Sequence, residues 1–197
     1  SQMSTSHTYH SLLEQIRQIR SQERITRLRT LAWLMTGMFL ARSVHLSRSA
    51  NHISGPAQRS SKRQRLRRWL KNPAVRVRSW YEPLAIALLT TAAQHGTVRL
   101  LADGTKVGGG HRLLMVAVAY RRRALPIVWT WVRDQRGLSS SYKQCALLAY
   151  LQRLLPPEVA VVFIGDSEFS GTPVKRLLEC WGWGYVVRHK GDHQVQL

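Results

Sequence analysis

Acidic residues are scarce in this sequence of 197 residues. It holds 10 Asp and Glu against 30 Lys and Arg, a formal net charge of +20. Such an excess of positive charge attracts polyanions, and nucleic acid is the first candidate. The excess is uneven, because residues 1–99 hold 17 basic and three acidic side chains whereas residues 100–197 hold 13 and seven. We therefore expect double-stranded DNA as a partner, held mainly by the amino-terminal half.

Cysteine is equally rare, and its rarity excludes two kinds of site. Cys145 and Cys180 are too few for a disulfide framework, and their spacing matches no zinc signature. The eight histidines are scattered without the spacing of metal ligands. Reduced thiols and a cytoplasmic location are the expectation.

Long apolar runs are also missing. The most apolar amino-terminal stretch, residues 31–41, is about half the length that spans a bilayer. It also lies too far from the amino terminus for a signal peptide. We expect no membrane partner and a core helix at this position.

The amino-terminal half has the apolar period of helices. We predict helices over residues 11–20 and 25–42, with a loop at 51–61 that contains a Gly-Pro pair. A further helix is expected to begin near Glu82-Pro83, where proline suits the first turn, and to end before Gly96. Residues 1–10 are polar and predicted to be frayed. Residues 1–96 are thus expected to form a basic helical DNA-binding region.

One segment of this half, residues 62–71, combines a narrow apolar face with dense positive charge. Leu66, Trp69 and Leu70 share one face of the predicted helix. Its basic residues are candidates for contacts with DNA phosphates: Lys62, Arg63, Arg65, Arg67, Arg68 and Lys71. The alternative is a solvated helix face, and the scarcity of acids favours DNA.

From residue 97 the sequence changes to the pattern of strands. Strands are predicted at 98–107, 113–120, 124–132, 159–166 and 184–188, with helices after Ser139-Ser140-Ser141 and at 173–179. Three glycines at 108–110 predict a hairpin turn, since no Lys-Ser/Thr follows them as in a phosphate loop. The order β-β-β-α-β-α-β with right-handed crossovers predicts an α/β fold, a mixed five-stranded sheet over residues 97–197. In this topology the first and fourth strands are neighbours.

Each of those two strands ends in an aspartate, Asp103 and Asp166. Six apolar residues before Gly165 predict that the fourth strand is covered on both faces. If the strands are parallel neighbours, both carboxylates lie at the sheet edge where α/β proteins bind ligands. Close carboxylates repel each other, and a shared Mg²⁺ or Mn²⁺ relieves that repulsion. The alternative is structural, with Asp103 capping a turn and Asp166 capping the next helix.

Four segments in order resemble the catalytic domain of DDE transposases from bacterial insertion sequences, which has an RNase H-like fold. The segments are Leu101-Ala102-Asp103-Gly104-Thr105, Ala119-Tyr120-Arg121-Arg122-Arg123-Ala124-Leu125-Pro126-Ile127-Val128-Trp129, Ile164-Gly165-Asp166-Ser167-Glu168-Phe169 and Gly182-Trp183-Gly184-Tyr185-Val186-Val187-Arg188-His189-Lys190-Gly191. The stretch that contains them, from about Leu100 to Gly191, is about half of the chain.

This resemblance implies metal-dependent phosphoryl transfer at DNA ends in a bacterial cytoplasm. Two Mg²⁺ ions about 3.5–4 Å apart would serve the reaction, with Asp103 between them and Asp166 on one. Lys106, Arg188 and Lys190 are candidates for holding phosphates, with ordinary solvation at strand ends as the alternative. The resemblance also allows a homodimer on DNA.

The sequence departs from the family at two points. Ser167-Glu168 stands where the family usually has Arg-Gly, and the family's third acid is a glutamate on a later helix. The chain ends at Leu197 before such a helix, and neither Glu168 nor Glu179 matches that position. We interpret the chain as a truncated or inactive transposase. Two alternatives stay open: a DNA-binding protein without catalysis, and a nuclease with the same fold.

Overall fold

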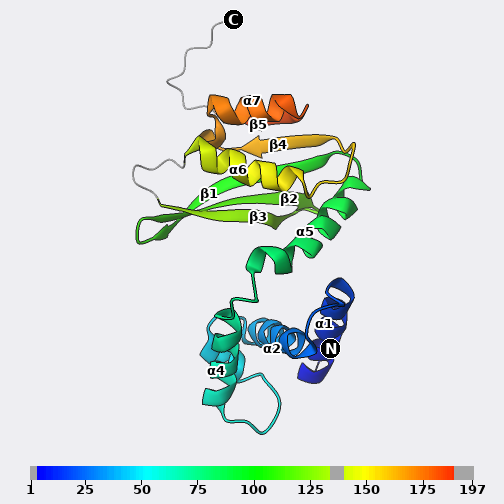
Figure 1. The fold of residues 1–197 in the computed structure, drawn as a ribbon, viewed down its shortest axis with the longest axis vertical. Helices are drawn as coiled ribbons and strands as arrows, with labels where there is room; N and C mark the ends of the chain where they lie inside the picture. Colours follow the sequence, from blue (N-terminus) through cyan, green and yellow to red (C-terminus); the bar gives the residue numbers. More distant parts are fainter. Residues whose placement is uncertain (1–3, 134–139, 189–197) are drawn as a thin grey trace, which may run out of the picture. The chain divides into compact units, whose positions relative to one another are not determined.

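The chain forms two compact units, residues 1–81 and 82–197 (Figure 1). The computed structural model describes residues 4–133 and 140–188. The predicted change from helix to strand at residues 96–97 is present, and the division between units lies further upstream, within a helix. None of the helices in the described ranges has both the length and the apolar character that crossing a membrane requires.

The amino-terminal unit is built from helices. They are α1 (Thr5–Ile19), α2 (Ile25–Ala41), α3 (Leu46–Ala50), α4 (Arg59–Leu70) and the start of α5 (Val77–Ala93). α1 packs on α2, where the rings of Tyr9 and Trp33 stack with centroids 3.9 Å apart. α4 buries Leu66 beside Leu34 of α2, and the Trp69 indole N–H donates to the Arg27 carbonyl oxygen at 3.1 Å.

α1 begins six residues before the predicted start, so the expectation of a frayed segment is wrong from Thr5 onward. Ser4 is the reason at the first turn, because its hydroxyl accepts a hydrogen bond from the His7 N–H at 3.2 Å. Tyr9 then anchors this turn in the core. Most side chains in residues 4–10 are polar, so the sequence here shows no apolar repeat from which a helix could be predicted.

The predicted start of α5 at Glu82-Pro83 is also wrong. The helix begins at Val77 and contains Pro83 in its interior. Proline cannot donate to the carbonyl four residues earlier, which here belongs to Ser79. A guanidinium N–H of Arg20 donates to that oxygen instead, at 2.6 Å. The lost helical bond is therefore replaced by Arg20, the residue that follows α1.

The carboxyl-terminal unit has the five-stranded mixed sheet that the sequence predicts, with α6 drawn in front of it in Figure 1. The strands are β1 (Val98–Gly108), β2 (His111–Tyr120), β3 (Arg123–Arg133), β4 (Val161–Gly165) and β5 (Gly184–Val187). Their order is β3-β2-β1-β4-β5, with β1, β2 and β3 antiparallel and β1, β4 and β5 parallel. The RNase H-like fold class is confirmed.

Two tight hairpins join the antiparallel strands. Gly108, Gly109 and Gly110 all have positive φ, which confirms the predicted glycine turn. Arg121 and Arg122 have φ of 46° and 62° in the second hairpin, a conformation that is unfavourable for residues with a side chain.

Helices cover one face of the sheet in the described part of the unit. α6 (Ser141–Gln152) contacts α7 (Thr172–Cys180), and the amide of Gln144 in α6 reaches the segment after β4. Val161 and Phe163 of β4 are buried, whereas the alternate residues Val162 and Ile164 are only half-buried. The expectation that β4 is covered on both faces is therefore wrong, because the other face has less cover.

Candidate active site

The register of β1 and β4 brings the two predicted aspartates to neighbouring positions. The parallel pairing runs from Val98 with Val161 to Ala102 with Gly165. Asp103 is the next residue of β1, and Asp166 directly follows the end of β4. Neighbouring strands are about 4.8 Å apart. The structure thus brings both aspartates to the same carboxyl edge of the sheet.

Strand alternation places the pair on one face. Leu100 and Ala102 are buried on the face that α6 covers, and Asp103 is exposed. On β4, Phe163 shares the covered face, and Asp166 falls on the opposite face by the same alternation. Asp103 and Asp166 therefore lie on the less covered face, with access to solvent.

Asp166 has the structural role that the alternative prediction gave it, whereas Asp103 lies within β1 and caps no turn. Asp103 Oδ1 accepts from the Gly104 N–H at 2.8 Å. Asp166 Oδ1 accepts from the Glu168 N–H at 3.0 Å and so caps a short 3₁₀ helix, η1 (Ser167–Phe169). Within residues 4–133 and 140–188, no basic group pairs with either carboxylate. These hydrogen bonds use one oxygen of each carboxylate and leave charge for a cation.

Glu168 lies on the opposite side of the sheet from this pair. Its side chain is 3% exposed, and its Oε2 accepts from a guanidinium N–H of Arg112 at 2.5 Å. Arg112 lies on β2 in the same face as Gly104 and Leu114. Glu168 is therefore a partner in a buried ion pair, and it is not a third acid beside Asp103 and Asp166.

This ion pair explains a glycine inside β1. A Cβ on Gly104 would overlap the Glu168 carboxylate, so the close approach requires glycine here. Gln144 of α6 donates to the Glu168 carbonyl oxygen at 3.0 Å. The segment that follows Asp166 is thus fixed to β1, β2 and α6. This network was not predicted from the sequence. Its one indication in the sequence is Glu168, which stands where the transposase family usually has Arg-Gly.

The three bases expected near the site have different positions. Arg188 follows β5, and its N–H donates to the Gly165 carbonyl oxygen at 3.1 Å, so it lies beside Asp166 at the same edge. Lys106 shares the face of Gly104 and is exposed near the hairpin turn, on the other side from Asp103. Lys190 lies outside the described residues.

The six bases predicted to contact DNA lie on α4 or at its end, and two have partners within the unit. The Lys62 ammonium donates to the carbonyl oxygens of Ile53 and Gly55 at 2.7 and 2.8 Å, and so holds the loop before α4. Arg65 donates to the Thr30 hydroxyl at 3.3 Å. The remaining four are exposed and have no hydrogen-bond or ion-pair partner among the described residues: Arg63, Arg67, Arg68 and Lys71.

The two aspartates suit one divalent cation. Their ligand atoms are carboxylate oxygens, which Mg²⁺ and Mn²⁺ prefer, and Mg²⁺ commonly takes one or two carboxylates and keeps several waters. Groups of three or more potential ligands from His, Cys, Asp and Glu are absent from the described ranges. The pair therefore fits an ion whose remaining ligands are water or other oxygen groups.

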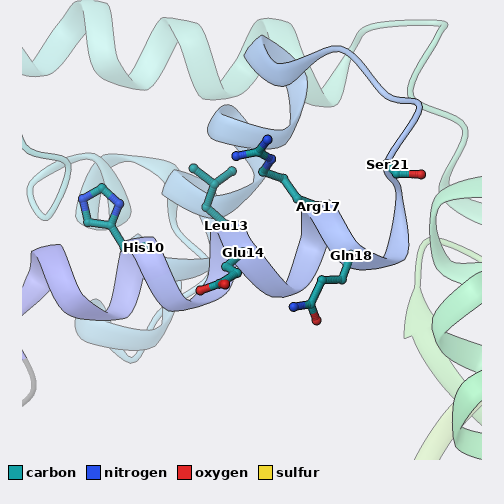
Figure 2. Close-up of a pocket in the computed structure, with 6 residues that line it drawn as sticks. All are labelled: His10, Leu13, Glu14, Arg17, Gln18 and Ser21. Carbon is teal, nitrogen blue, oxygen red and sulfur yellow. The ribbon is translucent and has the colours of Figure 1, made fainter.

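A pocket of about 530 Å³ lies along α1 in the amino-terminal unit (Figure 2). Its lining side chains come from this helix and the turn after it: His10, Leu13, Glu14, Arg17, Gln18 and Ser21. They have mixed charge, and no pair of them forms a constellation for catalysis. We assign no chemistry to this pocket.

Two solved structures with similarity to this chain are of transposases. One is the catalytic domain of Mos1 mariner transposase, 14% identical with a TM-score of 0.33 over 56% of this chain and 60% of that one. The other is the Mos1 strand transfer complex, 12% identical with a TM-score of 0.32 over 82% of this chain and 58% of that one. The chain thus spans about three fifths of their length. At these scores the fold assignment rests on the strand order and register alone. No protein-family model and no curated protein matches the sequence.

Proposed function

We propose that this chain acts in DNA transposition by metal-dependent phosphoryl transfer, as a DDE-type transposase of a bacterial insertion sequence. One observation carries the proposal: the β1–β4 register sets Asp103 and Asp166 side by side on the accessible face of an RNase H-like sheet. The four sequence segments that resemble this family include both aspartates.

In this proposal Asp103 and Asp166 hold Mg²⁺ or Mn²⁺ through their carboxylate oxygens. The bound ion supplies activation of a water or DNA 3′-hydroxyl and stabilisation of the leaving oxygen. Arg188 lies at the same edge and is exposed, so it can bind a phosphate of the DNA strand. The basic amino-terminal unit holds the duplex through its exposed arginines.

The test is cleavage of supercoiled plasmid DNA with Mn²⁺ and the full chain. Asp103→Asn and Asp166→Asn should each abolish metal-dependent nicking, whereas binding to duplex DNA should survive both changes. Glu158→Gln is the matched control, since Glu158 is an exposed acid outside the strands and should not affect nicking. DNA binding without nicking by the unchanged chain would favour a binding protein. Nicking that persists in both aspartate variants would refute the proposal.

A further inference from the structure

A second pocket of the amino-terminal unit, about 310 Å³ in volume, lies between α3 and α4. Its lining contains three arginines, two serines and an asparagine: Ser47, Arg48, Asn51, Arg59, Ser60 and Arg63. We call these six residues the arginine pocket. All of them can donate hydrogen bonds, and none is acidic. An anion is therefore the ligand that this lining suits.

The three guanidinium groups of the arginine pocket form no ion pair or side-chain hydrogen bond with the described residues. Arg48, Arg59 and Arg63 are all exposed. The only acids in residues 1–81 are Glu14 and Glu23. Glu23 is already paired with Arg20 and Arg27, at 3.5 and 2.8 Å. Three like charges that line one pocket repel each other, and an anion would relieve this repulsion.

The first turn of α4 adds hydrogen-bond donors to the arginine pocket. Arg59 and Arg63 are four residues apart and so share one helix face, with Ser60 beside them. Gln58 at the N-cap makes no capping hydrogen bond through its side chain, and no acid lies in the first turn. The free N–H groups of that turn and the arginines favour the same kind of ligand.

We propose that the arginine pocket binds a phosphate group of the DNA backbone. This inference deepens the proposed function and rests on its DNA partner. Guanidinium groups bind phosphate oxygens in a bidentate manner, and serine hydroxyls and the asparagine amide are common additional donors. The lining has no aromatic side chain on which a base could stack, so a sugar–phosphate backbone fits better than a nucleotide. Arg48, Arg59, Ser47, Asn51 and Ser60 thereby extend the DNA contact beyond the bases predicted from sequence.

The test compares two double variants that remove equal charge. Arg48→Gln with Arg59→Gln changes the arginine pocket, and Arg29→Gln with Arg76→Gln changes two exposed arginines outside it. Affinity for a duplex is measured by fluorescence anisotropy at several salt concentrations, and circular dichroism checks folding. The pocket variant should bind at least about tenfold more weakly, because its charged hydrogen-bond donors to phosphate are removed. Its slope of log K against log salt should be shallower by about 0.9 for each phosphate that the variant no longer neutralises.

The outcomes separate this proposal from the proposed function. Equal losses of affinity in the two double variants, with a steep slope for the unchanged chain, would overturn the arginine pocket and leave DNA binding intact. No duplex binding by the unchanged chain would overturn both. A loss of affinity confined to the pocket variant would support the pocket even if the chain showed no nicking of DNA.

Discussion

The two units place charge in opposite ways. In the amino-terminal unit, arginines such as Arg63, Arg67 and Arg68 are exposed and have no partner among the described residues. In the carboxyl-terminal unit, the Arg112–Glu168 pair is buried, and Asp103 and Asp166 lie at fixed neighbouring positions. Composition is enough to predict a surface for polyanions. The adjacency of the two aspartates depends instead on the register of β1 and β4.

The largest expected effect comes from breaking the buried ion pair. Glu168→Gln removes the carboxylate from an ion pair whose two side chains, Arg112 and Glu168, are 12% and 3% exposed. We expect a loss of about 3–5 kcal/mol in the free energy of unfolding, measured by urea denaturation.

Glu158→Gln is the control for that change, because Glu158 is an exposed acid with no side-chain partner among the described residues. It should cost less than about 0.5 kcal/mol. Equal costs for the two variants would show that the carboxyl-terminal unit does not depend on buried charge.

The second effect compares the positive charge of the two units directly. Replacing Arg63, Arg65, Arg67 and Arg68 by glutamine should weaken duplex binding about 100-fold for all DNA sequences, because several phosphates are no longer neutralised. The same four changes at Arg121, Arg122, Arg123 and Arg153 remove equal charge from the carboxyl-terminal unit and should have a much smaller effect. If both sets weaken binding equally in a filter-binding assay, net charge rather than α4 holds DNA.

A smaller and opposite effect is expected in the β2–β3 hairpin. Arg122 has a φ of 62°, where glycine avoids the clash of a side chain. Arg122→Gly should therefore raise the free energy of unfolding by about 1 kcal/mol. Thermal unfolding checks this, and a lower melting temperature would mean that the arginine side chain stabilises the turn.

The smallest effect concerns acid stability in the amino-terminal unit. Burial raises the pKa of Glu23, but the Arg24 N–H and the Arg27 and Arg20 guanidiniums outweigh it, so the pKa lies below its usual value. A carboxyl pKa that is lower in the folded chain stabilises the fold above the unfolded value near about 4.3. This contribution is lost as pH falls through the folded pKa.

Glu23→Gln should remove that contribution, worth about 0.5 kcal/mol at neutral pH. The difference in melting temperature between the variant and the unchanged chain should shrink from pH 7 to pH 3. A difference that stays constant over this range would contradict the assigned pKa shift.

The sequence predicted features that depend on neighbours along the chain. Apolar runs predicted the strands, and three glycines predicted the first hairpin. The right-handed crossover rule predicted that β1 and β4 are neighbours. Features that depend on distant partners were missed. Arg112 and Glu168 are 56 positions apart, and no periodicity pairs them. Arg20 similarly supplies the hydrogen bond that Pro83 removes, so a proline that was expected to start a helix lies inside one.

The central claim is a divalent-cation site shared by Asp103 and Asp166. The most direct measurement is Mn²⁺ binding to the full chain by electron paramagnetic resonance, with Asp103→Asn, Asp166→Asn and the control Glu158→Gln. We predict that the unchanged chain and the control bind Mn²⁺, and that each aspartate variant binds it at least about tenfold more weakly, since one of the two protein ligands is removed. Binding of equal strength in all four proteins would contradict the site.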